Sequence, residues 1–361
     1  MNQPALPCAQ YIKEIGRGRD NARALSRDDA FTVWGALLDG RIADLEVGAI
    51  LMAMRIKGES VEEIAGFLAA TEPRGLRLTA PRDAHDVESI PVAIPSYNGA
   101  RNMPNLTPLL ACLLAREGVT VLVHGKTATP ASKADREGLR SAHAFDAPDF
   151  ASPPPPRVTS AEIFETMGLP VCRNVEDAAA QWARGEPAFM SITDLNAPLA
   201  RVLALRRMMG VRSPAHTLVK LLQPFDSRAV RLASFTHPEY HDALSAYFTQ
   251  FPQAGDVLLM RATEGEPVAN ARRLATIERF HEGVSAIVAH GDSGVVRELP
   301  LIPESRDAAT TAVWIQAVLS GERPVPVAIA AQRDAILATR EAMGEGIAAA
   351  ATVRPARLTA A

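Results

Sequence analysis

Basic side chains are concentrated in one stretch of the sequence, and such cations bind phosphate or carboxylate groups. Residues 101–231 contain 16 Lys and Arg against 12 Asp and Glu, in a chain whose formal net charge is −3. An arginine fork donates two parallel hydrogen bonds to either a carboxylate or a phosphate, so it does not choose between them. The candidate cations are Arg101, Lys126, Lys133, Arg136, Arg140, Arg201, Arg206, Arg207, Arg212 and Lys220.

Polar residues around one predicted helix form a second candidate group. Asn105 and Thr107 stand at the start of a helical stretch at 106–115, where aligned backbone amides favour an anion. Tyr97 and Asn98 follow an apolar run, and a tyrosine in this position either stacks on an exposed base or packs on the core. These four side chains are candidates for a phosphate or nucleic-acid site.

Two acids and one histidine complete the candidates. Glu264 and Glu266 are weak candidate metal ligands, because Mg²⁺ prefers carboxylate oxygens, but a glycine separates them and Pro267 follows. His124 follows an apolar strand, so we expect either a hydrogen-bonded structural residue or one that faces a ligand. The sequence predicts no required cofactor, and Mg²⁺ only if the chain is an enzyme.

The overall composition is that of a globular protein. Apolar residues make up 47% and charged residues 22% of 361 residues, which excludes a disordered or fibrous chain. Apolar runs end well short of the roughly 20 residues that span a bilayer, and the N-terminus lacks a basic-then-apolar signal pattern. We expect a cytoplasmic protein without membrane contact. Its three widely spaced cysteines predict neither disulfides nor a metal cluster.

Two lobes must position these side chains, and the first is helical. Apolar residues recur at helical spacing over 26–67, and Ser26 and Ser60 each stand three residues before an acid, which is the pattern of a helix N-cap. We assign residues 1–78 to a small helical N-terminal domain. Its apolar stripe is typical of either a core or a dimer interface.

The second lobe begins where short β-rich runs start to alternate with helical stretches. The expected strands lie at 92–94, 119–123, 229–235, 257–260 and 286–289, and the expected helices include 106–115, 161–167 and 199–209. Such alternation predicts βαβ units. The fold class is therefore α/β, with the small helical domain joined to a larger α/β domain at 85–345 that has a mostly parallel central sheet.

Residues 126–157 interrupt this alternation. They contain four consecutive prolines at 153–156 and few apolar residues. Structureless loops longer than about 12 to 15 residues are usually functional or disordered. We expect a flexible, basic and proline-rich insertion here, and a frayed tail at 350–361.

Several strings of residues match a known family in order along the chain. They are LDG at 38–40, ILMAMR at 50–55, KGES at 57–60, RRMMG at 206–210 and LQP at 222–224. About four-fifths of the chain resembles the anthranilate phosphoribosyltransferase-like family, which has the glycosyltransferase family 3 fold. The resemblance implies a fold of the nucleoside phosphorylase and phosphoribosyltransferase type and a homodimer formed through the helical domain.

The resemblance also implies a site for phosphoribosyl pyrophosphate, but the matching residues differ from the family pattern. The G-T-G-G-D loop is matched by SYNGA at 96–100, the K-H-G-N signature by VHGK at 123–126, and the magnesium-binding D-G-L-D-E stretch by TEGEP at 263–267. Arg206 and Arg207 match the arginine that holds the substrate carboxylate. With one glycine and no acid, the first loop is not expected to hold pyrophosphate in the usual way.

Two functional hypotheses follow, and both are compatible with a dimer. SYNGAR at 96–101 and NLTP at 105–108 look like the YbiB-type branch of the family, described as DNA-binding, which favours a sequence-nonspecific binder of single-stranded DNA or RNA. The alternative is a phosphoribosyltransferase with an altered acceptor, whose rate would depend on electrostatic stabilisation of departing pyrophosphate. A purely structural or regulatory dimer is a third possibility.

Overall fold

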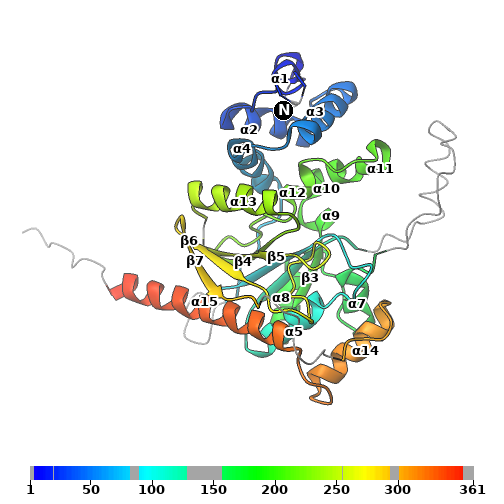
Figure 1. The fold of residues 1–361 in the computed structure, drawn as a ribbon, viewed down its shortest axis with the longest axis vertical. Helices are drawn as coiled ribbons and strands as arrows, with labels where there is room; N and C mark the ends of the chain where they lie inside the picture. Colours follow the sequence, from blue (N-terminus) through cyan, green and yellow to red (C-terminus); the bar gives the residue numbers. More distant parts are fainter. Residues whose placement is uncertain are drawn as a thin grey trace, which may run out of the picture.

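The computed structural model describes residues 4–18, 20–81, 89–127, 157–253, 255–292 and 301–352. In this part of the chain a helical lobe sits on an α/β lobe (Figure 1). The expected insertion lies outside the described residues except at its two ends, and so does most of the expected tail. No described helix combines the length and apolarity needed to cross a membrane.

Four α-helices and a short 3-10 turn build the helical lobe. They are α1 (Ala9–Ile15), α2 (Arg27–Leu38), α3 (Asp44–Lys57), α4 (Val61–Thr71) and η1 (Glu72–Arg74). Ser26 caps α2 and Ser60 forms a capping box at the start of α4, as their spacing predicts. The rings of Trp34 and Phe67 pack with centroids 4.7 Å apart, and Trp34 Nε1 donates to the hydroxyl of Thr71 at 2.9 Å. These contacts join α2 to α4.

The α/β lobe is built on a seven-stranded sheet in the order β3-β2-β1-β4-β5-β6-β7. Its strands are β1 (Val92–Ser96), β2 (Val121–Gly125), β3 (Ala188–Ser191), β4 (Ala229–Phe235), β5 (Gly255–Arg261), β6 (Ile277–His281) and β7 (Val284–Ala289). Strands β1 to β5 pair in parallel, and β6 and β7 form an antiparallel edge. The prediction of a mostly parallel sheet is confirmed, although the sequence patterns missed β3 and β6.

Helices cover both faces of the sheet. One face packs on α5 (Thr107–Arg116), α7 (Ser160–Thr166), α14 (Ala308–Leu319) and α15 (Val327–Thr352). The other packs on α8 (Val175–Ala183), α9 (Ile192–Leu195), α10 (Ala197–Ala204), α12 (Ala215–Leu218) and α13 (Pro238–Gln250). The expected helix at 199–209 is divided at Leu205 into α10 and α11 (Arg206–Met209).

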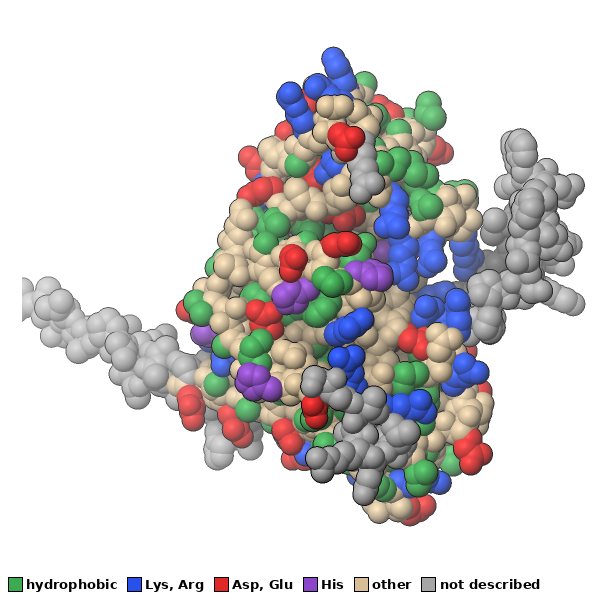
Figure 2. Space-filling view, in the orientation of Figure 1, with side chains coloured by type: hydrophobic (Ala, Val, Ile, Leu, Met, Phe, Trp, Pro, Cys, Tyr) green, Lys and Arg blue, Asp and Glu red, His purple; other side chains and the backbone are tan. Residues whose placement is uncertain are grey.

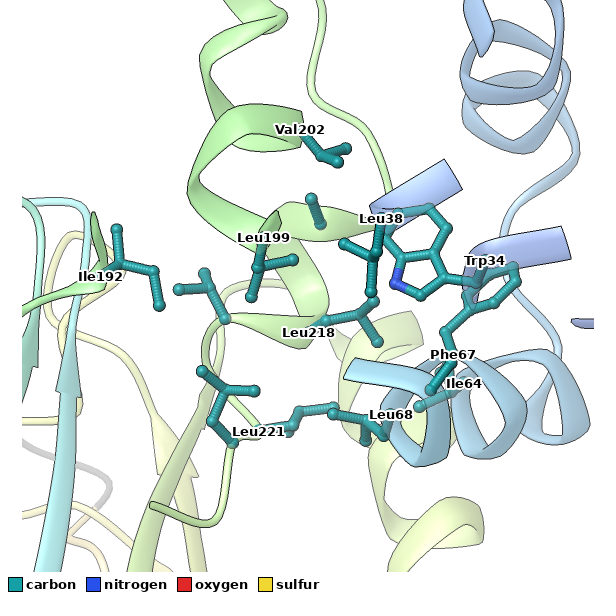
Figure 3. Packing of buried hydrophobic residues seen from close by; sticks show 14 of the residues in the cluster. Trp34, Leu38, Ile64, Phe67, Leu68, Ile192, Leu199, Val202, Leu218 and Leu221 are labelled. Atoms are coloured by element: carbon teal, nitrogen blue, oxygen red, sulfur yellow. The ribbon is translucent and has the colours of Figure 1, made fainter. Parts of the chain in front are cut away.

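The two lobes share one apolar core. Figure 3 shows side chains of α2 and α4 facing side chains of α9, α10, α12 and the residues just after α12. Those labelled are Trp34, Leu38, Ile64, Phe67, Leu68, Ile192, Leu199, Val202, Leu218 and Leu221. Two polar bonds cross the same boundary, from Asn196 Nδ2 to the carbonyl of Thr71 and from the Arg201 guanidinium to the carbonyl of Leu38, both at 2.9 Å. A close-packed core of this kind fixes how the lobes sit on either side of the cleft.

Glycine at position 66 is required by the close approach of α2 and α4. An added Cβ would lie 2.4 Å from the carbonyl oxygen of Arg27 and 2.8 Å from the Cβ of Ala30. We predict that Gly66→Ala lowers the free energy of unfolding by about 1 to 3 kcal/mol through overpacking. Gly48 lies in α3 with open space around it, so Gly48→Ala should stabilise the protein by about 0.5 to 1 kcal/mol. Urea denaturation measures both changes, and equal effects would contradict the packing argument.

Candidate functional site

The site lies where the parallel strands end. The carboxyl ends of parallel strands meet at one edge of a sheet, and ligands bind in the crevice where the strand order reverses. Here β1 lies between β2 and β4, so the loop that follows β1 stands at this point. The loop after β5 and the segment 206–220 lie beside it, beneath the helical lobe.

Glu266 closes the first part of the loop after β1. Its Oε1 accepts hydrogen bonds from the backbone amides of Asn98 and Gly99, both at 2.7 Å. The side chain is only 1% exposed, and burial raises the pKa of its carboxyl. Gly265 has φ +96, and a Cβ there would lie 2.3 Å from Asn98 Nδ2, so the two loops interlock at a glycine.

Glu264 closes the second part of the same loop. Its carboxylate accepts hydrogen bonds from the amides of Arg101 and Asn102 at 2.6 and 2.8 Å. Arg157 lies 3.7 Å from the same carboxylate and also donates to the carbonyl of Gly99 at 2.8 Å. Glu264 adopts φ +55, a conformation that costs a residue with a side chain about 1 kcal/mol or more. These hydrogen bonds hold the residue in that conformation.

These two acids do not fit a magnesium site. Glu264 accepts backbone N–H groups with both of its carboxylate oxygens, and Glu266 does so with Oε1 alone. The remaining oxygen of Glu266, Oε2, is buried, and the charge of Lys220 acts on this carboxyl, whereas Mg²⁺ requires several oxygen ligands in near-octahedral arrangement. No group of three His, Cys, Asp or Glu side chains suited to a metal occurs among the described residues. We therefore assign Glu264 and Glu266 to the closure of the loop.

Three sequence-predicted residues lie in the interior. Asn105 Nδ2 donates to Ser160 Oγ at 3.1 Å, and its Oδ1 accepts from the amide of Thr107 at 3.1 Å. Asn105, Thr107 and His124 are each at most 1% exposed. Burial lowers the pKa of His124 to about 4, which leaves it neutral at pH 7. The prediction that these side chains contact a phosphate does not suit a buried position, and we leave them out of the surface proposed below.

Six basic side chains, which we call the cationic cluster, gather between the lobes (Figure 2). They are Lys126, Arg157, Arg206, Arg207, Arg212 and Lys220. Burial and the charges of Arg207 and Arg206 lower the pKa of Lys126, and burial and Arg206 do the same to Arg212. Of the six, Arg157 alone joins an ion pair with a described residue.

Lys220 connects the closed loop to the cationic cluster. Burial, together with the nearby charges of Arg212 and Arg157, lowers its pKa to about 8, against the opposing charge of Glu266. Arg212 donates to Asn98 Oδ1 at 3.1 Å, which ties the segment 206–220 to the loop after β1. The charged form of Lys220 is therefore destabilised by its surroundings, and a bound anion would stabilise it.

The other predicted residues divide between the core and the part of the chain not described. Tyr97 packs against the core and meets the ring of His216 edge-on at 5.9 Å, and burial raises its pKa. The side chain of Arg101 is half-buried, and its carbonyl accepts from Arg306 at 3.0 Å. Lys133, Arg136 and Arg140 lie outside the described residues. Sequence patterns missed Arg157 and His216, although His216 stands four residues from both Arg212 and Lys220.

A cavity of about 580 Å³ opens beside the cationic cluster. Its walls come from the end of α3 and the start of α4, from α12, and from the end of β4 with the start of α13. Both lobes therefore contribute to it. Arg212 and Lys220 of the cationic cluster line the cavity, and so does His216.

The fold and this interlobe cleft define a class of protein. The helical lobe matches the model of the glycosyl transferase family, helical bundle domain, over residues 9–71. The crystal structure of anthranilate phosphoribosyltransferase from Thermus thermophilus is similar with a TM-score of 0.60 and 19% identity, covering 93% of this chain and 94% of that chain. At this identity the similarity establishes the fold.

Sequence relatives narrow the class to a family. YbiB of Escherichia coli (strain K12) is 38% identical over 344 residues, which are 94% of this chain and 97% of YbiB. The anthranilate phosphoribosyltransferase of Methylobacterium nodulans is 24% identical over 351 residues, 94% of this chain and 92% of that protein. The chain belongs, with YbiB, to the anthranilate phosphoribosyltransferase-like proteins of glycosyltransferase family 3.

Loss of the Glu266 carboxylate should destabilise the loop after β1. Glu266→Ala leaves the amides of Asn98 and Gly99 without an acceptor, which we expect to lower the free energy of unfolding by about 2 kcal/mol or more. Glu266→Gln keeps an oxygen in place, so its effect should be smaller. Urea denaturation compares the two variants, and equal stability would show that the hydrogen bonds contribute nothing.

Proposed function

We propose that the cationic cluster binds the phosphate backbone of nucleic acid, with single-stranded DNA or RNA as the ligand and without sequence preference. The observation that carries this proposal is crowding of like charge. Arg206, Arg207 and Arg212 lower the pKa values of neighbouring basic groups, and none of the three has an acidic partner among the described residues. A chain of phosphates relieves this repulsion at several points at once.

The spread of the charges favours a polyanion over a single small anion. The cluster extends from Lys126 after β2, through the exposed arginines of α11, to Lys220 at the edge of the cavity. A flexible strand can follow such a surface, and contacts to its backbone carry no base information. DNA and RNA are therefore both suitable ligands.

The closed loop makes ordinary phosphoribosyl transfer the weaker hypothesis. In a transferase of this fold, backbone amides of the loop after β1 would have to face pyrophosphate, whereas here four of them donate to Glu264 and Glu266. A diphosphate would have to displace both carboxylates against its own negative charge. We infer that the standard pyrophosphate loop has been lost.

Removing three charges from the cluster should weaken binding. We predict that Arg206→Ala/Arg207→Ala/Lys220→Ala lowers the affinity for a labelled single-stranded oligonucleotide at least tenfold at 50 mM salt. It should also reduce the slope of log K against log salt by about 2, since each phosphate contact contributes about 0.7. Fluorescence anisotropy across a salt series measures both quantities.

The matched control removes the same charge from a distant surface. Arg17→Ala/Arg23→Ala/Arg323→Ala changes residues at the outer end of the helical lobe and after α14, and should leave affinity and slope unchanged. If the two triple variants behave alike, the binding surface is elsewhere. Phosphoribosyl pyrophosphate added as a competitor should not displace the strand; displacement would return the transferase hypothesis to first place.

Binding should weaken as the pH rises through the pKa of Lys220, which is about 8. Below that pH the ammonium is charged and attracts phosphate, and above it the charge is lost. Between pH 7 and 9.5 we expect affinity to fall about threefold to tenfold, the size of one charge-assisted contact. Lys126→Arg/Lys220→Arg stays charged throughout and should remove this fall; an unchanged pH profile in that variant would contradict the assignment.

A further inference from the structure

The cavity beside the cationic cluster has a chemistry that differs from that of the cluster itself. Apolar and aromatic groups make up part of its lining, namely Met54, Ile56, Ile64, Phe235, Tyr240 and Leu244. Two carboxylates, Glu59 and Glu239, also line it. Four basic residues, Arg55, Lys57, Arg212 and Lys220, line it as well, so the cavity combines apolar groups with charges of both signs. Its volume of about 580 Å³ is in the range of sites for small organic molecules.

His216 lines this cavity, and one nitrogen of its ring is buried without a hydrogen-bond partner among the described residues. Its side chain is buried, and Nδ1 lies 3.2 Å from the backbone amide of Ser213, which always carries a proton. We assign Nδ1 as the acceptor of that amide proton, with the Ser213 carbonyl also 3.3 Å from Nδ1. In the neutral ring the proton is then on Nε2, which has no partner among the described residues.

Burial keeps this ring neutral. The pKa of His216 is lowered to about 4, first by burial and then by the charges of Arg212 and Arg206. At pH 7 the residue is thus a neutral N–H donor. An unsatisfied buried donor of this kind costs about 1 to 3 kcal/mol until it meets an acceptor. A rotation of the ring that brought Nε2 to the cavity surface would let a carbonyl oxygen or ring nitrogen of a ligand supply one.

The remaining groups suit a flat heterocycle. Tyr240 is 38% exposed at the cavity and offers a ring face for stacking, and Phe235 lies at the end of β4, shortly before α13 begins. Glu59 and Glu239 can accept hydrogen bonds from amino groups, and Arg212 and Lys220 in the same lining can donate. Stacking faces with both donors and acceptors are what proteins use to hold unstacked bases.

We propose that this cavity receives one unstacked base of a single strand whose phosphates lie on the cationic cluster. The inference rests on the proposed function and adds to it. It makes the ligand single-stranded, because a paired base cannot enter, and it makes the base itself a contributor to affinity. Arg212 and Lys220, which belong to both the cluster and the cavity lining, would lie between the phosphates and the base.

The test compares two labelled strands of equal length and charge by fluorescence anisotropy at 50 mM salt. One is a mixed-sequence DNA 15-mer, and the other carries abasic sites throughout. We expect the strand with bases to bind about tenfold more tightly, as one stacked base contributes in other proteins. Equal affinity of the two strands would overturn this inference but not the proposal that the cationic cluster binds phosphates. If neither strand binds, both proposals fail.

Two variants test whether the base binds within the cavity. Ala243→Phe fills the space and Tyr240→Leu removes the ring, so each should abolish the tenfold preference without changing affinity for the abasic strand. Ala317→Phe, on α14 beneath the opposite face of the sheet, controls for an added ring and should keep the preference. A preference that survives both cavity variants would overturn the assignment. Circular dichroism verifies that each variant is folded.

Discussion

A buried backbone N–H must find an acceptor, and the loop after β1 finds its acceptors in Glu264 and Glu266. This constraint decides what the carboxyl edge of the sheet can do. Four amides of the loop donate to internal carboxylates and are therefore not free for an external phosphate. Glu264 accepts with both of its oxygens and Glu266 with Oε1. These contacts are what supports the proposed loss of the pyrophosphate loop.

In the proposed function, basic side chains rather than backbone amides attract the phosphates. Backbone amides bind one phosphate at close range, whereas long basic side chains reach several phosphates at larger and variable distances. Lys126 and the arginines of α11 lie close enough for the charges of Arg207 and Arg206 to lower the pKa of Lys126. Glu264 pairs with Arg157 and Glu266 acts on Lys220, whereas Arg206, Arg207 and Arg212 form no ion pair with a described acid. The proposed binding of a nucleic-acid backbone would use these three charges.

Sequence patterns predicted the lobes but not the contacts within the site. Period and capping residues identified the helical lobe and five of the seven strands, because these depend on neighbours in the chain. Strand β3 has four residues and β6 carries two charges, so neither stands out as an apolar run. The hydrogen bonds of Glu266 join residues 167 and 168 positions apart, and no local spacing reveals such a pair. Asn105 and His124 were chosen by motif position, which does not report burial.

Gly125 shows why a residue of a family motif can be retained for packing alone. A Cβ at this position would lie 1.7 Å from the carbonyl oxygen of Ser96, so the spacing of β1 and β2 alone excludes every other residue. His124 beside it is enclosed between the neighbouring strands at the register of Pro95 and Met190. Packing explains Gly125, whereas the two ring nitrogens of the buried His124 have no hydrogen-bond partner among the described residues. The residues that we propose to contact a ligand are the exposed arginines and the cavity walls. The retained His-Gly pair therefore reports the fold and does not identify a function. The cationic cluster and the cavity belong to the site, and a function has to be argued from the site.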